Sequence, residues 1–382
     1  MRDVFIAGAG QTPVDEHWGL GLRDLGAAAI RAALDDAGIE TVDALFVGNM
    51  LGGRLNGQEN LGPLLADAAG LLPAEAWKVE AACASGGAAV RAAALAVASG
   101  MHDVAVAVGV EKMTDAPSDQ VTAGLATAAD QDFESSHGLS FVAHSALLMR
   151  RYMHETGVAR EDFAPFAVNA HRNAVTNPNA LFREAITEEI FARSPQVASP
   201  IGVLDAAPVC DGAAAVVICA REALRPAHRP VRIAAAATAT DTIGLARRAD
   251  LLTLEAAKRS AEKAFALSGF SPGDINFFEV HDAFTVITAL SLEACGFAPR
   301  GEALKRAARG CFAPGGCLPI STFGGLKARG HPVGASGAYQ IVEAVSQLRG
   351  EAGANQIPGA RVALTQSIGG HGSVAVTHIL EA

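Results

Sequence analysis

The chain has 382 residues and a formal net charge of −10, and 50% of its residues are hydrophobic while 18% are charged. That balance is typical of a compact globular protein rather than a disordered one, and the length allows one large core or two packed halves. The negative charge argues against general nucleic-acid binding, which needs a basic surface. A small phosphate-bearing ligand stays compatible, because helix N-termini and a few arginines supply local positive sites.

Location and redox state follow from the start of the chain and from its cysteines. The first apolar strand begins almost at the initiator Met, with no secretory leader before it, and no apolar run is expected to reach the roughly 18 residues of a membrane span. The six cysteines lack the paired spacing of zinc sites. We therefore expect a cytoplasmic protein without a membrane segment. Cys311 and Cys317 could pair, but unpaired loop thiols are the expectation.

Short apolar runs alternate with longer amphipathic stretches, which predicts an α/β fold, and this alternation occurs twice. Each copy runs strand, helix, glycine, strand, at residues 3–7, 22–37, 38 and 42–47 in the first and at 231–237, 254–268, 269 and 275–280 in the second. Glycine just past a helix supplies the left-handed conformation of a C-cap. The chain is therefore predicted to hold two related halves.

Later in each copy, a glycine-rich turn leads into an Ala-rich helix that ends at a glycine. The first turn is Cys83-Ala84-Ser85-Gly86-Gly87, whose helix ends near Gly100, and the second spans residues 330–337, whose helix ends near Gly350. Two such units could pack these helices face to face between two sheets. Both turns would then lie near a pseudo-twofold axis.

A segment at about residues 113–195 interrupts the repeat and is richer in polar residues. A connection of this length is better explained as a functional lid or binding subdomain than as a plain loop. The first half resumes at residues 211–218, where Asp211-Gly212 forms a turn that feeds a buried strand.

Cys83 is the first candidate for chemistry, because it follows an apolar segment and begins the first Ala-rich helix. A thiol at a helix N-terminus feels the positive end of the helix dipole, which favours thiolate. Taken alone, the motif is weak evidence, because such a cysteine is more often a small buried residue. His331 strengthens the catalytic interpretation, because it occupies the same stage of the second copy and could pair with the thiol, although a lone histidine beside proline is usually a turn residue.

Two further segments fall where a binding crevice would open. His281 and Asp282 follow a predicted parallel strand, whose C-terminal end borders such a crevice. The segment 367–372, Ser-Ile-Gly-Gly-His-Gly, offers backbone N–H groups that could form an oxyanion hole.

With these residues in view, the sequence resembles a thiolase along nearly its whole length. The resemblance rests on five motifs in the family's order, at residues 79–87, 109–113, 211–214, 280–284 and 324–332. His281-Asp282-Ala283-Phe284 stands where many thiolases have Asn-Glu-Ala-Phe. This points to the branch that holds archaeal acetoacetyl-CoA thiolases and sterol-carrier-type thiolases.

The resemblance implies a duplicated thiolase fold, with two βαβαβαββ-like halves in five α/β/α/β/α layers. Residues 1–112 with 196–225 would form the N-terminal half, residues 230–382 the C-terminal half, and residues 113–195 the inserted loop domain that carries much of the CoA site. The family needs no metal or redox cofactor, and CoA enters as a substrate. A homodimer or a tetramer would be expected.

The resemblance also implies roles for individual residues. Cys83 would accept the acyl group, and His331 would keep it as thiolate. The backbone N–H groups of Cys83 and Gly369 would bind the oxyanion of the thioester intermediate. His331 and His281 would hold the oxygen of the second acyl-CoA as it becomes an enolate.

One departure from the family pattern bears on the mechanism. Most thiolases use a second cysteine to move the proton of the attacking carbon, and both of its usual positions are changed here, to Ser367 and Ala283. Losing that proton transfer without replacement would cost on the order of a hundredfold or more. His281, His371, four residues after Ser367, or Cys210 could substitute, although a solvent-facing His371 and a buried structural Cys210 are the simpler expectations.

Three hypotheses follow. The first is an acetoacetyl-CoA-thiolase-type acyltransferase that works through acyl-Cys83. The second keeps the nucleophile for a decarboxylating condensation or a C-acylation, together with a small OB-fold and zinc-ribbon partner protein. The third is a CoA-binding scaffold that has lost efficient catalysis.

Overall fold

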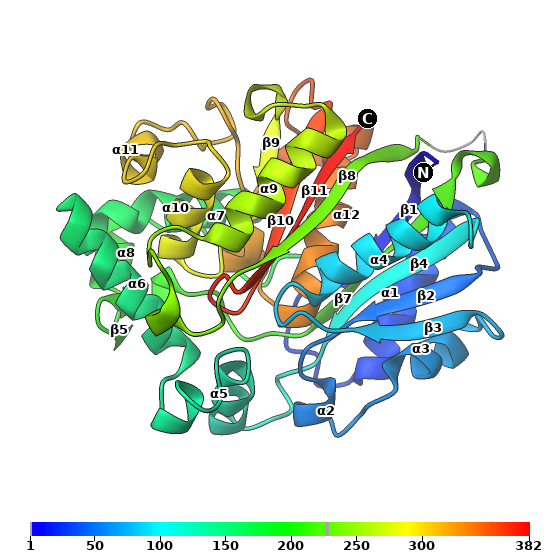
Figure 1. Cartoon of the computed structure of the whole chain (residues 1–382), viewed down its shortest axis with the longest axis horizontal. Coiled ribbons are helices and arrows are strands. Elements are labelled where there is room, and N and C mark those ends of the chain that lie inside the picture. Colours follow the sequence, from blue (N-terminus) through cyan, green and yellow to red (C-terminus); the bar gives the residue numbers. More distant parts are fainter. Residues whose placement is uncertain (1, 226–228) are drawn as a thin grey trace.

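In the computed structural model, which describes residues 2–225 and 229–382, nine strands form one mixed sheet (Figure 1). The first half supplies five strands in the order β3-β2-β4-β7-β1, and the second half supplies four in the order β8-β11-β10-β9. The strands of the first half are β1 (Val4–Gln11), β2 (Ala44–Gly48), β3 (Glu75–Val79), β4 (Val104–Glu111) and β7 (Gly212–Ala220). Those of the second are β8 (Val231–Thr240), β9 (Phe277–Glu279), β10 (Val362–Gly369) and β11 (Val374–Glu381).

The predicted repeat is confirmed, except that the described residues of the second half include no full strand equivalent to β3. In the second half, the position of β3 is taken by a single parallel bridge between Phe278 and Ile320. The expectation of two separate sheets was wrong in one respect, because the halves are hydrogen-bonded to each other. β1 and β8 pair antiparallel over Phe5 with Arg232 and Ile6 with Val231. Each is the outermost strand of its half, so this short pairing satisfies two edges that would otherwise be open.

The helices form the predicted layers around the two halves of the sheet. On the outer face of the first half lie α1 (Leu22–Ala37) and α3 (Leu61–Ala69), and between the halves lie α4 (Ser85–Ser99) and α12 (Ser336–Arg349). Beyond the second half lie α9 (Glu255–Ser268) and α10 (Thr285–Ala294). The helices α1, α4, α9 and α12 each end at a glycine with positive φ, as predicted.

The inserted segment is mainly helical and lies on the side of the second half (Figure 1). It contains α5 (Ser118–Ala126), α6 (Phe141–Thr156), α7 (Ala164–Ala174) and α8 (Glu188–Arg193), and is followed by the hairpin strands β5 (Gln196–Ala198) and β6 (Ile201–Gly202). Two short helices, α2 (Gly52–Leu55) and α11 (Ala303–Ala308), lie in connections of the first and second halves.

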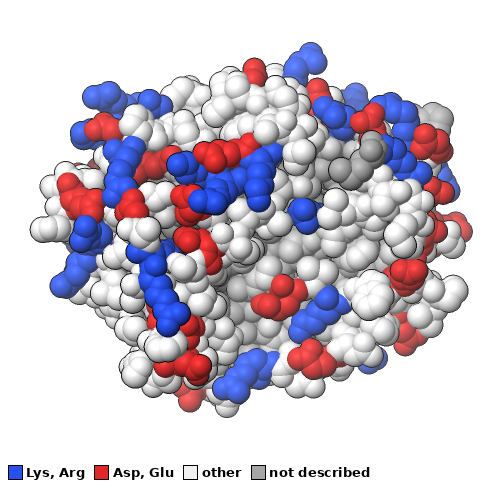
Figure 2. Space-filling view, in the orientation of Figure 1, with Lys and Arg blue, Asp and Glu red and all other residues white. Residues whose placement is uncertain are grey.

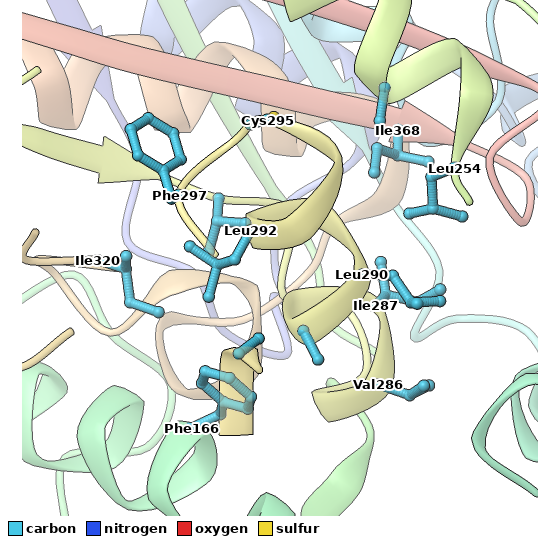
Figure 3. Close-up of a cluster of buried hydrophobic side chains, with 14 of the residues drawn as sticks. Phe166, Leu254, Val286, Ile287, Leu290, Leu292, Cys295, Phe297, Ile320 and Ile368 are labelled. Atoms are coloured by element: carbon cyan, nitrogen blue, oxygen red, sulfur yellow. The ribbon is translucent and has the colours of Figure 1, made fainter. Parts of the chain in front are cut away.

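Helix α10 joins the insert to the second half, and apolar side chains surround it (Figure 3). Val286, Leu290 and Leu292 are buried in one cluster with Phe166 of α7 and with Ile320. A helix that is apolar on all sides must be enclosed by protein. The insert is therefore part of the hydrophobic core of the second half rather than a separate surface loop.

Three expectations need correction or comment. Cys311 and Cys317 form a disulfide, because the turn between them brings their Cα atoms to 4.9 Å. The window Ala82–Ser99 is apolar and long enough for a membrane span, contrary to expectation, but 56% of it is buried as the central helix α4. The proposed boundary between the halves falls partly on residues 226–228, which lie outside the described residues.

The surface charges are mixed rather than grouped by sign on the face shown in Figure 2. Several of them form ion pairs, and Arg300 binds both Asp250 and Glu155. The net charge of −10 is therefore spread over the surface instead of forming one wide patch on that face.

Candidate active site

The central helices α4 and α12 approach each other through glycines near their N-termini. A Cβ atom on Gly337 would lie 2.4 Å from the backbone nitrogen of Gly87, and one on Gly86 would lie 2.9 Å from the nitrogen of Ala338. Contacts that short exclude any side chain at these positions. The approach brings the turn that precedes α4, with Cys83, next to the turn that precedes α12, with His331.

Glu111 at the end of β4 fastens the two turns together. Its buried carboxylate accepts hydrogen bonds from the backbone nitrogens of Met50, Leu51 and Gly334, at 2.9 to 3.0 Å, and from the side chain of Asn49. Gly334 belongs to the turn that carries His331, whereas Asn49–Leu51 belong to the first half. One carboxylate therefore links the two copies of the repeat beside the nucleophile.

A second carboxylate connects two of the motifs. Asp211 binds Lys112 in a buried ion pair at 2.7 Å, and it accepts hydrogen bonds from the backbone nitrogens of Met113 and Thr114. Met113 in turn packs against Cys83. The Gly-Val-Glu-Lys-Met and Asp-Gly-Ala-Ala motifs thus act as one anchor at the start of the insert.

The last two motifs meet at Asp282. Its carboxylate accepts from the backbone nitrogen of Leu326 at 2.6 Å and from the hydroxyl of Ser321 at 3.0 Å. Gly325 adopts a φ of +56°, and a Cβ there would collide with this carboxylate. Asp282 therefore fixes the turn of the π-helix Gly325–Arg329 that leads to His331.

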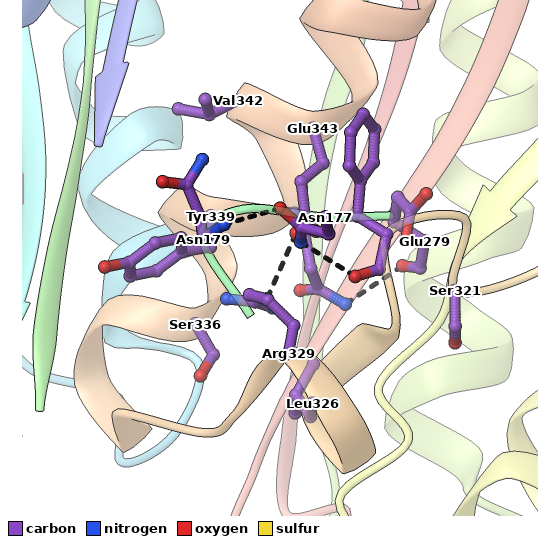
Figure 4. Close-up of polar contacts among 12 residues, drawn as sticks. Asn177, Asn179, Glu279, Ser321, Leu326, Arg329, Ser336, Tyr339, Val342 and Glu343 are labelled. Carbon is purple, nitrogen blue, oxygen red and sulfur yellow. Dashed lines mark hydrogen bonds and ion pairs between the residues drawn. The ribbon is translucent and has the colours of Figure 1, made fainter. Parts of the chain in front are cut away.

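Behind the histidines, Arg329 is completely buried and points toward Glu343 of α12 (Figure 4). Its Nε lies 3.1 Å from Glu343 Oε1, and its guanidinium stacks 4.6 Å from the ring of Tyr339. Burial and the positive charge of Arg329 both lower the pKa of His281, to about 3. The same causes, with His281 added, hold the pKa of His331 well below its ordinary value. Both imidazoles are therefore neutral at physiological pH.

Cys83 and His331 line one cavity of about 420 Å³. Its walls are mostly apolar, and the insert contributes Met113 and Phe141 while the second half contributes Phe284. The exposed Trp18 and Glu16 also border this cavity. The structure thus brings together the two residues that the repeat had paired, and it encloses them.

The nucleophile turn is strained and buried. Ala82 adopts a φ of +49°, which is uncommon for a residue with a side chain and typical of functional turns. Burial, with the negative charge of Glu111 added, raises the pKa of the Cys83 thiol to about 12. Hydrogen bonds from the backbone N–H groups of Cys83 and Gly370 oppose this shift but are weaker. The resting sulfur is therefore a neutral thiol, which corrects the thiolate expected from the helix dipole.

The hydrogen bonds of His331 determine which ring nitrogen is the base. Its Nδ1 lies 2.6 Å from the hydroxyl of Ser336, and that hydroxyl is 3.3 Å from the carbonyl oxygen of Pro332. A carbonyl only accepts, so when Ser336 donates its one proton to Pro332 it accepts from His331 Nδ1–H. Nε2 then carries a lone pair, and it is buried with no hydrogen-bond partner within the described part of the chain. His331 is thereby set up as the base for the Cys83 thiol.

The same reasoning gives His281 the opposite tautomer. Its Nδ1 accepts a hydrogen bond of 3.3 Å from the backbone N–H of Ile368, so the proton of the neutral ring is on Nε2. The ring lies 5.3 Å from that of His331 in an edge-to-face arrangement. In this tautomer His281 offers an N–H donor but no free lone pair as a base, and it lies beside His331 rather than among the residues that line the cavity.

Neither usual position of the second cysteine offers a replacement. Ser367 fills the notch between Gly87 and Gly337, and its hydroxyl donates to the side chain of Gln340 at 3.1 Å. It is not among the residues that line the cavity. Ala283 does line the cavity, but it carries no reactive atom. Gly369 stays the predicted oxyanion donor, while the N–H groups that lower the pKa of the Cys83 thiol are those of Cys83 itself and of Gly370.

His371 and Cys210, the two other candidates to replace the second cysteine, do not face the cavity either. His371 is buried rather than facing solvent, and its Nε2 binds the carbonyl oxygen of Phe141 at 3.0 Å. Cys210 is buried, and burial raises the pKa of its thiol further above the ordinary value even though the backbone N–H of His331 donates to it. Neither lines the cavity with Cys83. Among the described residues, His331 is therefore the histidine that shares the cavity with Cys83.

Sequence reasoning missed Ser336 and Glu111 as parts of the site. Ser336 lies five residues after His331, at the first residue of α12, so the two side chains lie on the same turn of the chain. This spacing could have indicated a hydrogen bond to the imidazole. Glu111 ends a strand of otherwise apolar residues, and a lone carboxylate in a buried strand is a sign of a polar anchor.

A buried thiol and a neutral histidine in one apolar cavity are the groups that acyl transfer through a covalent cysteine intermediate requires. Comparison with known families agrees. Residues 4–222 match the thiolase N-terminal domain, and residues 237–382 match the thiolase C-terminal domain-like family. The chain belongs to the thiolase family and is an acyltransferase of that family.

The relatives also support the predicted branch. An acetyl-CoA acetyltransferase of Methanothermobacter thermautotrophicus is 44% identical, with 99% of each chain covered. Sterol carrier protein 2 of Bos taurus is 31% identical over 98% of this chain and 71% of that one. A solved structure described as an Ltp2-ChsH2(DUF35) aldolase superimposes with a TM-score of 0.87 at 28% identity, covering 100% of this chain and 98% of that chain.

The protonation state of Cys83 has a direct test. Because the pKa of the thiol is raised to about 12, the thiolate fraction grows with pH throughout the accessible range. The rate of Cys83 alkylation by iodoacetamide, followed by peptide mass spectrometry, should rise continuously from pH 6 to beyond pH 9. A plateau that begins below pH 7 would instead indicate a thiolate–imidazolium pair in the resting enzyme.

The tautomer assignment predicts a specific effect for Ser336→Ala. Without the hydroxyl, Nδ1–H loses its acceptor and the ring can turn or change tautomer, so acylation of Cys83 should slow about 10- to 100-fold, part of the 10² to 10⁴ that a positioned base contributes. Ser260→Ala is the matched control, because its buried hydroxyl bonds to Thr377 on the far side of the second half. Equal acylation rates in the two variants would contradict the assignment.

Proposed function

We propose that this enzyme condenses two acyl-CoA molecules, or cleaves a 3-oxoacyl-CoA with CoA, as an acetyl-CoA acetyltransferase. The observation that carries the proposal is the buried Nε2 of His331, which has no hydrogen-bond partner among the described residues and belongs to a residue that lines the same cavity as Cys83. The 44% identity to an acetyl-CoA acetyltransferase over the full length supports it. We further propose that the insert at residues 113–195 binds CoA, because it forms one wall of this cavity.

In the first half-reaction, His331 Nε2 takes the proton of the Cys83 thiol as the sulfur attacks the thioester carbonyl. The backbone N–H groups of Cys83 and Gly369 stabilise the oxyanion. The bond from the carbonyl carbon to the CoA sulfur then breaks, and the departing CoA thiolate takes the proton from His331. The products are acyl-Cys83 and CoA, and His331 is neutral again.

In the second half-reaction, the same nitrogen serves again as the base. His281 Nε2–H donates to the thioester oxygen of the second acyl-CoA, and His331 Nε2 removes a proton from its α-carbon. The carbanion attacks the carbonyl of acyl-Cys83, and the bond to the Cys83 sulfur breaks. The released thiolate takes the proton back from His331. One base used twice therefore balances the reaction without the second cysteine of other thiolases.

The charge of the cavity argues against a decarboxylating condensation. Among its lining residues in the described chain, none is a lysine or an arginine. A malonyl carboxylate would thus enter an apolar site without a partner, which is energetically unfavourable. An uncharged acyl group such as acetyl meets no such cost.

A second candidate is an enzyme that acts on another acceptor together with a partner protein. Two observations favour it. Ala283 leaves the cavity without a second thiol, and the similar solved structure is an Ltp2-ChsH2(DUF35) aldolase. We propose a small OB-fold and zinc-ribbon protein as the partner in that case.

We also propose a homodimer formed through β3. This strand is at the end of the sheet order and has one open edge, which is available to pair with another strand. Trp77 on this strand and Leu72 just before it are 59% and 62% exposed. Burying these side chains against a second copy would remove the exposed apolar surface.

Acetylation of Cys83 tests the enzyme directly. Purified protein mixed with acetyl-CoA should show the mass of one acetyl group on the Cys83 peptide, Cys83→Ala should show none, and malonyl-CoA should give no decarboxylated product. Acetoacetyl-CoA and CoA should then yield acetyl-CoA. An acetylated cysteine without turnover unless an OB-fold protein is added would favour the second candidate. Tight CoA binding with no acetyl-enzyme would favour the scaffold.

The dimer has its own test. Light scattering should give twice the monomer mass for the native protein, and Trp77→Lys should shift it toward the monomer because a charge would be buried at the interface. Met101→Lys is a matched control, since Met101 is also strongly exposed but lies outside β3. A monomeric native protein would contradict the proposal.

A further inference from the structure

His371 occupies the glycine-rich turn after β10, next to the N–H groups assigned to the oxyanion, and the chemistry above does not use its ring. Gly370 and Gly372 on either side adopt positive φ values of 60° and 101°, so the backbone turns sharply here. A Cβ on Gly369 would lie 2.3 Å from the carbonyl oxygen of Ala81 in the nucleophile turn. A small shift of this turn would therefore move the oxyanion donors relative to Cys83.

The ring of His371 reaches from this turn to the first residue of α6 in the insert. Its Nε2 donates to the carbonyl oxygen of Phe141, and the two ring centroids are only 3.9 Å apart. Burial, with the neighbouring His144 added, lowers the pKa of His371 to about 3. The ring is therefore neutral and acts as a packed hydrogen-bond donor rather than as a charge.

Phe141 also lines the substrate cavity. It lines the cavity together with Phe284, and these two rings are 6.0 Å apart. The order of contacts is thus cavity, Phe141, His371 and the turn that holds Gly369 and Gly370. Any acyl group that pushes on Phe141 pushes on the oxyanion turn through one contact.

Contacts on the side away from Phe141 also fix the glycine-rich turn that contains His371. Arg248, itself buried, donates to the carbonyl oxygen of His371 at 2.7 Å, and the ring of His144 lies 4.7 Å from that of His371. Glu134 of the insert accepts from the backbone of Leu245, three residues before Arg248. With its carbonyl fixed on one side, the turn can respond to Phe141 chiefly through the His371 side chain.

We propose that His371 is a positioning residue that couples the Phe141 wall of the acyl cavity to the oxyanion turn, so that the enzyme senses the size of the acyl group. A short acyl group leaves Phe141 in place and the oxyanion donors aligned. A longer one displaces Phe141 and, through His371, misaligns them, so it binds but is transferred slowly. This inference rests on the proposed acyl transfer through Cys83.

Single-turnover acylation of Cys83 by acetyl-CoA, measured by rapid quench and mass spectrometry, separates rate from binding. His371→Ala should lower the limiting acylation rate about tenfold or more, since a misplacement of about 1 Å can cost 10²-fold, while the half-saturating concentration changes less than about twofold. His371→Gln, whose amide can donate to the same carbonyl, should recover most of the rate.

His378→Gln is the matched control for loss of a buried histidine. His378 lies on β11, both of its ring nitrogens lack partners within the described residues, and it does not line the cavity. This variant should keep the native acylation rate even if its melting temperature falls. Rates that follow the melting temperature in all three variants would overturn the proposal, as would a His371→Ala variant with the native rate.

If His371→Ala does not fold, Phe141→Leu tests the same coupling from the cavity side. In the native enzyme the acylation rate should fall steeply from acetyl-CoA to hexanoyl-CoA, and Phe141→Leu should reduce that difference at least about threefold, because the smaller side chain no longer presses on His371. An unchanged ratio would overturn the proposal. Native protein that forms no acyl-Cys83 with either thioester would instead refute the proposed function.

Discussion

The close approach of α4 and α12 is the constraint on which the site depends. Gly87 and Gly337 allow the two helices to touch backbone to backbone, and a single Cβ at either position would separate their N-termini. Only at this spacing do the turns with Cys83 and His331 border one cavity. The same contact explains Ser367, whose hydroxyl fits the notch between the glycines and binds Gln340. The side chain of Ser367 therefore has a packing role and does not reach the cavity.

Buried carboxylates hold the turns that this approach brings together. Glu111, Asp211 and Asp282 each accept backbone N–H groups from a segment distant in sequence, and none of them lines the cavity. A buried carboxylate is tolerable only when such donors surround it, so each one specifies the conformation of the segment that supplies them. The family motifs therefore encode the geometry of the site more than its reactivity. Cys83, His331 and His281 are the exceptions.

Much of this arrangement follows from local sequence rules. Glycine caps and hydrophobic periodicity predicted both copies of the repeat, and the copies in turn paired Cys83 with His331. The join between β1 and β8 was not predictable, because it depends on where two edge strands meet in space. The disulfide between Cys311 and Cys317 was rejected for a similar reason, since the turn between them is set by its surroundings. His371 was placed on the surface because a glycine-rich turn is usually exposed, whereas α6 of the insert covers this one.

The protonation state of Cys83 is the property that its position in the sequence predicted least well. A helix N-terminus favours thiolate, but the dipole and two backbone N–H groups are outweighed once the sulfur is removed from water and placed near Glu111. The consequence concerns the acyl-enzyme as well as the resting state. Burial disfavours a charged sulfur but carries no such penalty for a thioester, which is neutral. In the proposed mechanism, a sulfur with a raised pKa is also a poorer leaving group, which favours the acyl group on Cys83. Under the proposed acyl transfer, the environment that makes the free thiol unreactive thus stabilises the intermediate, and His331 supplies the proton transfers that make passage through it possible.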